Sequence, residues 1–422
     1  MLSEAQNKLL TETDPGTPCG DFMRRYWQPV ALSAELDLDT PMPVRVMGEN
    51  LVLFRDADGK PGLIERRCPH RGMDLSYGRL EPGGLRCLYH GWLFAKTGQC
   101  LEQPNEPASS TFKDRIKHRG YPCTEAGGLV LAFMGSGTPP PVPKMPFLMA
   151  DASHSSVSKR YHECNFVQAN DIDPSHLSFL HLLFDNGMAI GPSNQYNSQD
   201  SSPQTLVEET AFGLRAYSVR TLKTGESYVR LTNFIMPNMQ AFVGAPIFNP
   251  RERRPNDDDG YSLHWHVPID DEHHWKYVIH YSAVGPIDHE YQDAIQANEV
   301  DDQLRPIRTA QNRYLQDRQE MKTRTFSGVG TSFQDQDRLA VESQGAIYAR
   351  TFEHLGQADQ PMIEQRKLIF AGIEDVRAGR DPKILRNDGT DPFEELITRS
   401  AIIAPGVPVE GFWRGHVELV VP

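Results

Sequence analysis

The sequence lacks long hydrophobic runs and any excess of basic residues. Its longest apolar run, LVLAFM from Leu129, is far too short to cross a bilayer. Lys and Arg total 43 against 56 Asp and Glu, and the resulting net charge of -13 disfavours nucleic acid and anionic membranes as partners. We therefore expect the partners to be small molecules or other proteins, with no nucleic acid and no membrane among them.

The N-terminus also lacks an export signal, and cysteine is scarce. The opening MLSEAQNKLLTETD has no basic start followed by an apolar core, so we expect no secretory signal peptide. The chain has 6 cysteines, scattered at positions 19, 68, 87, 100, 123 and 164. In a long chain this scatter favours reduced thiols over a disulfide framework. We expect a cytoplasmic protein whose thiolates are free to bind metal.

The length and the turn residues predict two units of unequal size. At 422 residues the chain is long for one domain. Residues 44–65, VRVMGENLVLFRDADGKPGLIE, alternate short apolar runs with turn residues and predict antiparallel strands. The Pro- and Gly-rich residues 135–146 interrupt regular structure. We predict an α+β protein, with a small all-β domain over residues 1–140 and a larger α+β domain over residues 147–422.

The larger domain starts with a helix signal and continues with strand-like runs. Asp173 can cap a helix, and Pro174 suits a first helical position. Runs such as YVRLTNFIM and YSLHWHVPI predict strands, and the stretch from about residue 288 to 377 is charge-rich and mostly helical in pattern. Four histidines in the HWH and EHHW stretches are expected to be ordinary strand and turn residues: His264, His266, His273 and His274.

Two Cys-then-His pairs lie in RRCPHRGMDLSYGRLEPGGLRCLYHGW, residues 66–92. Cys68 and His70 form the first pair, and Cys87 and His90 form the second after a Gly-rich connection. Structural zinc sites more often pair two Cys in one half and two His in the other, or use Cys alone. Halves that each contain one Cys and one His suit a cluster of two irons, because one iron can bind both thiolates and the other both imidazoles. Neutral imidazoles raise the reduction potential of such a cluster, so the pattern indicates electron transfer.

The pattern Cys68-Pro-His70-Arg and Cys87-Leu-Tyr-His90-Gly-Trp, with sixteen residues between His70 and Cys87, resembles the Rieske [2Fe–2S] motif of ring-hydroxylating oxygenases. Four fixed positions match by chance in roughly one of two thousand chains of this composition. The resemblance implies that these four residues hold a Rieske [2Fe–2S] cluster. A structural zinc site is the alternative interpretation.

A second candidate site lies in ANDIDPSHLSFLH, which places Asp173, His176 and His181 at spacings of three and five. Residues three apart share a helix face, whereas residues five apart diverge by about 140° in an ideal α-helix. Convergence of both histidines on one metal would therefore need a local distortion such as a π-type turn. From the residues alone, ordinary partly buried histidines and a helix-capping aspartate are the alternative.

The same segment resembles the Asp-x-x-His-x4-His signature of Rieske oxygenases, which implies that His176 and His181 bind a mononuclear Fe(II). Two His and one carboxylate on one face of the iron leave positions open for dioxygen. In the family, the aspartate that matches Asp173 links a Rieske histidine of one subunit to an iron-ligating histidine of its neighbour. The resemblance gives Asp173 this catalytic role, and helix capping can accompany it.

The third iron ligand is expected to be a distant carboxylate. The block QDQDRLAVESQGAIYARTFEHLGQADQPMIEQRKLI resembles the C-terminal block of the phthalate-dioxygenase-like branch, where an Asp five residues before a Glu completes the metal set. This resemblance maps the third ligand to Asp337, with Glu342 as the marker. Asp335 is the rival, and a solvated helix start is the alternative interpretation for either aspartate.

The resemblance covers nearly the whole chain and implies a terminal oxygenase with a helix-grip catalytic domain, an antiparallel sheet flanked by helices. Such enzymes insert oxygen from O2 into aromatic acids or aryl ethers, by ring cis-dihydroxylation or by O-demethylation. They work as trimers or dimers of trimers. A Rieske-type electron-transfer protein without oxygenase activity and a zinc-stabilised binding module are the alternative functions.

Two expectations about partners follow. The chain has neither a plant-type C-x4-C-x2-C pattern nor a G-x-G-x-x-G fingerprint, so electrons from NAD(P)H are expected to arrive through a separate reductase. A carboxylated substrate would favour an arginine in the pocket. Arg215, Arg220 and Arg230 on predicted strands are the candidates, and surface salt bridges are the alternative for each.

Overall fold

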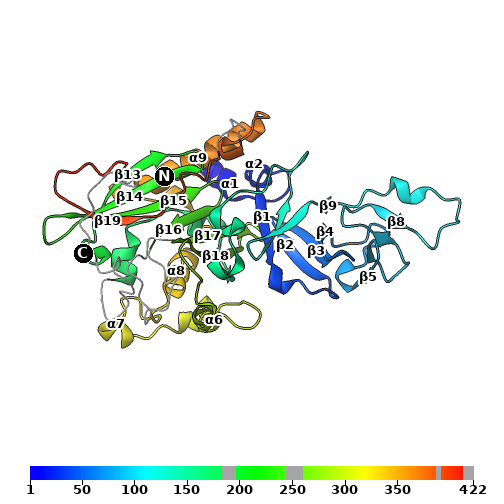
Figure 1. The fold of residues 1–422 in the computed structure, drawn as a ribbon, viewed down its shortest axis with the longest axis horizontal. Helices are drawn as coiled ribbons and strands as arrows, with labels where there is room; N and C mark the ends of the chain where they lie inside the picture. The colour runs from blue at the N-terminus through cyan, green and yellow to red at the C-terminus, as the bar shows by residue number, and fades with distance from the viewer. Residues whose placement is uncertain (183–195, 244–259, 386–390, 412–422) are drawn as a thin grey trace. The chain divides into compact units, whose positions relative to one another are not determined.

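The computed structural model describes residues 1–182, 196–243, 260–385 and 391–411 (Figure 1). The chain divides into two compact units. The smaller contains Glu12–Met149 and Val267–Asp271, and the larger contains Met1–Thr11, Ala150–His266 and the chain from Glu272 onward. These bounds differ from the expected ranges of 1–140 and 147–422, chiefly because the N-terminal helix belongs to the larger unit.

Long-range contacts explain the place of this helix, α1 (Glu4–Thr11). Just before it, the Leu2 N–H donates to the Arg350 carbonyl at 3.2 Å. Within it, Asn7 Nδ2 donates to the Tyr348 carbonyl at 3.1 Å. Because these partners lie more than 300 residues away along the chain, the local sequence could not reveal them.

The smaller unit is all-β, as the sequence predicts. Its strands form three antiparallel sheets, in the orders β1-β11-β10, β2-β3-β4-β9 and β5-β6-β7-β8. The strands are β1 (Trp27–Leu32), β2 (Met42–Val46), β3 (Glu49–Arg55), β4 (Pro61–Glu65), β5 (Arg79–Glu81), β6 (Gly84–Arg86), β7 (Leu93–Phe94), β8 (Cys100–Glu102), β9 (Gly120–Tyr121), β10 (Cys123–Ala126) and β11 (Leu129–Phe133). Short helices accompany them: α2 (Pro18–Met23), α3 (Pro146–Met149), η1 (Ser33–Glu35), η2 (Leu75–Tyr77) and η3 (Phe112–Arg115).

The predicted meander is the β2-β3-β4 sheet, and its turns follow from the turn residues. Met47 and Gly48 connect β2 to β3 with φ of 45° and 79°, the two-residue turn that suits the twist of a hairpin. Between β3 and β4, the Asp56 carboxylate accepts hydrogen bonds from the N–H groups of Asp58 and Lys60. Both turns are therefore fixed locally, by backbone conformation or by a short polar side chain.

The larger unit is built on an antiparallel sheet with the order β12-β18-β17-β16-β15-β14-β13, and β19 pairs with β15. The fold class of an antiparallel sheet flanked by helices is confirmed. The strands are β12 (Ser155–His162), β13 (Gln204–Glu209), β14 (Gly213–Thr221), β15 (Ser227–Ile235), β16 (Met239–Phe242), β17 (Gly260–Pro268), β18 (His274–Ser282) and β19 (Ser400–Ile403).

Helices flank this sheet. Helix α9 packs against β13 and β14, α6 packs near β12, and α8 packs near α4. Their bounds are α4 (Phe166–Asn170), α6 (His289–Ala297), α7 (Glu320–Thr323), α8 (Phe333–Glu342) and α9 (Gln360–Arg377). Shorter helical turns are η4 (Ala152–His154), η5 (Leu177–His181), η7 (Ala310–Leu315), η8 (Arg350–Phe352), η9 (Gln357–Asp359) and η10 (Lys383–Leu385). Within the described ranges, no helix is both long and apolar enough to span a bilayer.

Candidate metal centres

The Cys68 and Cys87 loops of the smaller unit share one backbone frame. In each loop the cysteine N–H donates to the carbonyl five residues later at 2.8 Å, and the cysteine carbonyl accepts from the glycine N–H four residues later. These glycines, Gly72 and Gly91, have φ of 72° and 73°, a left-handed conformation that favours glycine. The two loops are thus matching turns, although their histidines stand at different spacings from the cysteines.

The thiols lie inside the unit and the imidazoles lie nearer its surface. Cys68 and Cys87 are 3% and 2% exposed and belong to the hydrophobic core. His70 and His90 are only partly buried, with ring centroids 4.5 Å apart. His70 also stacks on Trp92, with the ring planes 7° apart. This separation of sulfur from nitrogen matches a cluster with a thiolate end and an imidazole end.

The spacing of these four side chains argues against a single zinc ion. Among the described residues, only His176, His181 and Asp337 bring three candidate ligand atoms within 4.8 Å of one another. A tetrahedral zinc ion would need its Cys and His ligands at least that close, whereas a two-iron cluster is wider. Burial and the neighbouring Cys87 raise the pKa of the Cys68 thiol to about 11, so metal binding would have to displace its proton.

The second set of ligands depends on a π-helical turn. The turn η5 (Leu177–His181) is a π-helix, and His176 immediately precedes it. The wider turn brings His176 and His181, five residues apart, to a ring-centroid distance of 5.1 Å. The predicted helix start is wrong in detail, because Pro174 lies in a bend before the turn and not at a first helical position.

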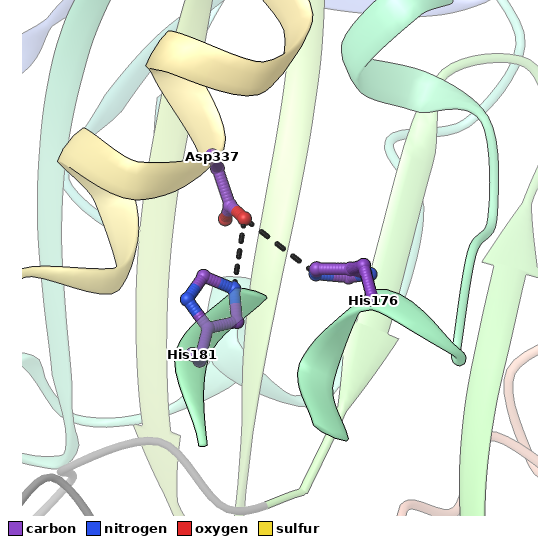
Figure 2. Close-up of side chains that lie close together, drawn as sticks. All are labelled: His176, His181 and Asp337. Carbon is purple, nitrogen blue, oxygen red and sulfur yellow. Dashed lines mark ion pairs between the residues drawn. The ribbon is translucent and has the colours of Figure 1, made fainter. Parts of the chain in front are cut away.

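Asp337 on α8 faces both histidines (Figure 2). Its Oδ1 lies 3.0 Å from His181 Nε2 and 3.5 Å from His176 Nε2. The rival Asp335 is directed elsewhere, since its Oδ1 accepts from Arg338 Nη1 at 2.6 Å. Two residues along an α-helix are about 200° apart around its axis, so the two aspartates cannot serve the same site.

Both imidazoles present Nε2 to Asp337. His181 Nδ1 lies 2.7 Å from Gln336 Oε1, and His176 Nδ1 contacts the Asp173 carbonyl. Because these partners are acceptors only, each Nδ1 carries a proton, and each Nε2 is the nitrogen left to bind a metal once any proton on it is displaced. Two imidazole nitrogens and one carboxylate oxygen therefore converge, which is the donor set of non-haem Fe(II) sites.

The electrostatics of this set favour a cation among the three side chains. Burial raises the pKa of Asp337, but the neighbouring His181 and His176 outweigh it and hold that pKa well below its usual range. Burial lowers the pKa of His176, but contacts with Asp337 and Asp173 raise it to about 9. Without metal, protons supply the positive charge, and a divalent ion would replace them on the same atoms.

Asp173 stabilises the bend that precedes the π turn. Its Oδ1 accepts from the Ser175 N–H at 2.9 Å and from the His176 N–H at 3.3 Å. Its Oδ2 lies 3.7 Å from His176 Nδ1, and the side chain is 37% exposed. The π turn itself begins after His176 without a side-chain cap, so Asp173 stabilises the bend before the turn and does not cap the turn.

A cavity of about 820 Å³ in the larger unit reaches these ligands. Five adjacent strands contribute every second residue to its wall, as expected for one face of a sheet. The π turn, α4, α6, α8, α9 and neighbouring loops contribute the rest. Apolar lining residues include Leu177, Phe242, Val278, Ile295, Phe333 and Met362. The volume and lining suit a small, largely apolar organic molecule next to the three ligands.

Known proteins share this combination of sites. Residues 26–122 match the Rieske [2Fe-2S] domain family, and residues 132–416 match the LigXa C-terminal domain like family. The oxygenase subunit of phthalate 4,5-dioxygenase from Pseudomonas putida is 33% identical over 404 residues, covering 90% of this chain and 88% of that protein. The chain belongs to the Rieske oxygenase family. It is a terminal oxygenase subunit of the phthalate-dioxygenase-like branch, with a Rieske [2Fe–2S] domain and a mononuclear-iron catalytic domain.

Other relatives of this Rieske oxygenase agree. The oxygenase subunit of 5,5'-dehydrodivanillate O-demethylase from Sphingobium sp. is 30% identical over 396 residues, which cover 92% of this chain and 84% of that protein. Dicamba monooxygenase with bound dicamba has the same fold, with a TM-score of 0.59 at 18% identity over 85% of this chain and 100% of that one. The carbazole 1,9a-dioxygenase terminal oxygenase from Novosphingobium sp. gives a TM-score of 0.56 at 22% identity, covering 87% and 97%.

The three arginines of this Rieske oxygenase that are candidates for binding a substrate carboxylate lie in different surroundings. Arg215 is buried and donates to Glu208 and the Glu395 carbonyl. Arg220 donates to the Pro174 carbonyl at 2.9 Å and to Ser178 Oγ at 3.0 Å, so it holds the π turn. Arg230 alone of the three lines the cavity.

Sequence reasoning missed several supports of the iron ligands. Gln336 Oε1 accepts a hydrogen bond from His181 Nδ1, and Gln336 Nε2 donates to the Gly330 carbonyl at 2.7 Å. Phe333 stacks on the His181 ring at a centroid distance of 4.2 Å. Lys276 on β18 places Nζ 4.0 Å from Asp337 Oδ2. The position of Gln336, one residue before the expected ligand, was the only available signal, because groups that orient a ligand often lie beside it.

The four histidines expected in strands and turns lie where predicted. His264 and His266 are on β17, His274 begins β18, and His273 precedes it. His274 Nδ1 bonds to the Cys164 carbonyl at 2.8 Å and its Nε2 lies 3.3 Å from His266 Nδ1. Burial holds the pKa of His266 well below its usual range, so this group is neutral. His264 also lines the cavity.

Proposed function

We propose that this terminal oxygenase inserts oxygen from O2 into an aromatic acid or an aryl ether. The observation that carries the proposal is the convergence of His176, His181 and Asp337 at the edge of a largely apolar cavity, in a chain that also carries a Rieske domain. Ring cis-dihydroxylation and O-demethylation are both compatible with this site. The named relatives include a phthalate dioxygenase and an O-demethylase, which favours this substrate range.

In this proposal Cys68, His70, Cys87 and His90 hold the Rieske cluster, and His176, His181 and Asp337 hold Fe(II). Bound Fe(II) would supply the chemistry that activates dioxygen, and the cluster would supply electrons one at a time. The protein positions the ligands through the π turn and Gln336. The cavity, with apolar and polar residues in its wall, would place the substrate next to the iron site.

The proposed partners follow from the chain's lack of its own electron source. A separate NAD(P)H-dependent reductase delivers electrons, because the sequence contains no dinucleotide or plant-type ferredoxin motif. The subunits assemble as a trimer or a dimer of trimers, so that Asp173 of one subunit can meet a Rieske histidine of the next. We place the enzyme in the cytoplasm, where cysteines that form no disulfide stay reduced and Cys68 and Cys87 can bind the cluster.

Labelled dioxygen tests the proposed function. The reduced, iron-loaded protein is exposed to ¹⁸O2 with phthalate or 3-methoxybenzoate, and products are identified by mass spectrometry. We expect ¹⁸O in a ring-dihydroxylated product of an aromatic acid, or 3-hydroxybenzoate plus formaldehyde from 3-methoxybenzoate, where the label enters the methyl carbon and leaves with the formaldehyde. Oxidation of the cluster with neither outcome across a panel of aromatic acids and methoxy-aromatics would favour the alternative, a Rieske-type electron-transfer protein.

Asp173 provides a second test, on electron delivery. In Asp173→Asn the side-chain oxygen can still accept from Ser175 and His176, so the bend should persist while the charge is lost. We expect both metals to be retained and the single-turnover rate of cluster oxidation to fall at least about tenfold. Ser175→Ala, which weakens the bend but keeps the charge, is the control and should stay near the wild-type rate. An unchanged rate in Asp173→Asn would remove Asp173 from the electron path.

A further inference from the structure

Lys276 is a buried cation next to the proposed iron site. It lies in the middle of β18, is 3% exposed and lines the cavity. Its Nζ is 4.0 Å from Asp337 Oδ2, too long for a hydrogen bond. In the described part of the chain this is its one ion pair, and its Nζ makes no hydrogen bond there. A buried ammonium group without an acceptor is costly, so this position calls for an anionic ligand.

The charges around Lys276 strengthen this argument. The strand register places Arg160 of β12 directly opposite Lys276, and like charges in that position repel. Glu299 neutralises Arg160, with Oε2 2.6 Å from Arg160 Nε. The other Glu299 oxygen accepts from Ser332 Oγ at 2.5 Å, so Glu299 is engaged on both sides. No described carboxylate other than Asp337 pairs with Lys276.

Iron binding would leave this wall positively charged. Asp337 balances Lys276 only while it is not shared with a divalent metal. With Fe(II) on the same carboxylate, the local charge is positive and an incoming anion would be stabilised. Building on the proposed oxygenase function, we infer that Lys276 binds the carboxylate of an aromatic acid substrate inside the cavity, and so selects acids over their neutral analogues.

Arg230 is the rival anchor, but its guanidinium is already engaged. It donates to Thr232 Oγ1 at 3.2 Å and to the Val243 carbonyl at 2.7 Å, and it lies over the Phe242 ring. No contact joins it to the three iron ligands within the described ranges. A substrate carboxylate bound to Lys276 would place the aromatic ring beside the iron. None of the contacts of Arg230 would place a bound substrate beside the iron.

Binding measurements on Lys276→Met test the inference. The anaerobic, iron-loaded protein is titrated by calorimetry with benzoate, phthalate and 3-methoxybenzoate, each compared with its neutral amide. Lys159→Met is the matched control, because Lys159 is also buried on the adjacent strand but lies on the other face of the sheet, over Trp275. Iron content and melting temperature are recorded for each variant. The acid-to-amide affinity ratio is compared within one variant, so a partial loss of folded protein cancels.

We expect the wild type and Lys159→Met to prefer at least one acid over its amide. In Lys276→Met the affinity for that acid should fall about tenfold or more, with amide binding within about threefold of wild type. The inference is wrong if Lys276→Met keeps the preference, if Arg230→Met loses it instead, or if the wild type prefers no acid. Loss of iron from Lys276→Met with an unchanged preference would assign Lys276 to the support of Asp337 and would also overturn the inference. Because no turnover is measured, a failure here is separate from a failure of the ¹⁸O2 experiment.

Discussion

Replacing Asp337 with alanine should abolish oxygenation and leave the Rieske spectrum unchanged. Among the described residues, Asp337 is the one carboxylate whose oxygen approaches both His176 Nε2 and His181 Nε2, at 3.5 and 3.0 Å. Two histidines alone bind Fe(II) weakly, so iron should fall from about three to about two per chain while sulfide stays at about two. Turnover should drop by at least about a thousandfold, as measured by substrate-dependent oxygen consumption.

Asp335→Asn is the matched control for this variant. Asp335 lies two residues away on the same helix but pairs with Arg338. The amide keeps a hydrogen-bond acceptor for Arg338, so the helix should persist and the iron should be retained. The protein should lose some stability, because the buried negative charge that pairs with Arg338 is gone. Full iron content and normal turnover in Asp337→Ala would show that Asp337 is not an iron ligand. Loss of iron in Asp335→Asn alone would identify Asp335 as the third ligand instead.

The second large effect is expected from Cys87→Ser, which should remove the Rieske cluster and with it all electron delivery. Cys87 is 2% exposed, and its thiolate is one of the two sulfur ligands proposed for the cluster. A hydroxyl is a poor substitute for a thiolate on iron. The smaller unit should also lose stability, because metal binding contributes to the folded state of a small domain. Visible absorbance, sulfide content and melting temperature measure the loss.

Cys100→Ser provides the comparison. Cys100 belongs to the same hydrophobic core and is 1% exposed, and its Sγ donates to the Glu102 carbonyl at 3.6 Å. The substitution adds a similar polar atom to the same core without touching a proposed ligand. We expect the cluster to persist in Cys100→Ser. An intact cluster in Cys87→Ser would refute the assignment of the second loop.

Features encoded by local patterns were predictable from the sequence. The Cys and His spacings, the turn residues of the β2-β3-β4 meander and the strand-like runs of the larger unit all lie within short stretches. Asp337 was reached through the resemblance of a whole block. The structure then explains the preference over Asp335, because the two side chains leave α8 in different directions.

Features that depend on long-range packing were not predictable. The spacing of His176 and His181 indicated that their convergence would need a distortion such as the π turn, but it did not show that Arg220, on a distant strand, stabilises this turn. Lys276 reads as one polar residue in an alternating strand, and only the assembled sheet shows that its face borders the iron site. The N-terminal helix joins the larger unit through partners more than 300 residues away.

The central claim is that one chain carries a Rieske cluster and a separate mononuclear iron. The most direct test is to count iron, zinc and acid-labile sulfide in protein purified without oxygen, and to record electron paramagnetic resonance after reduction with dithionite. We expect about three irons and two sulfides per chain with a Rieske-type signal. Zinc without sulfide would contradict the assignment of Cys68, His70, Cys87 and His90, and the oxygenase mechanism would fall with it.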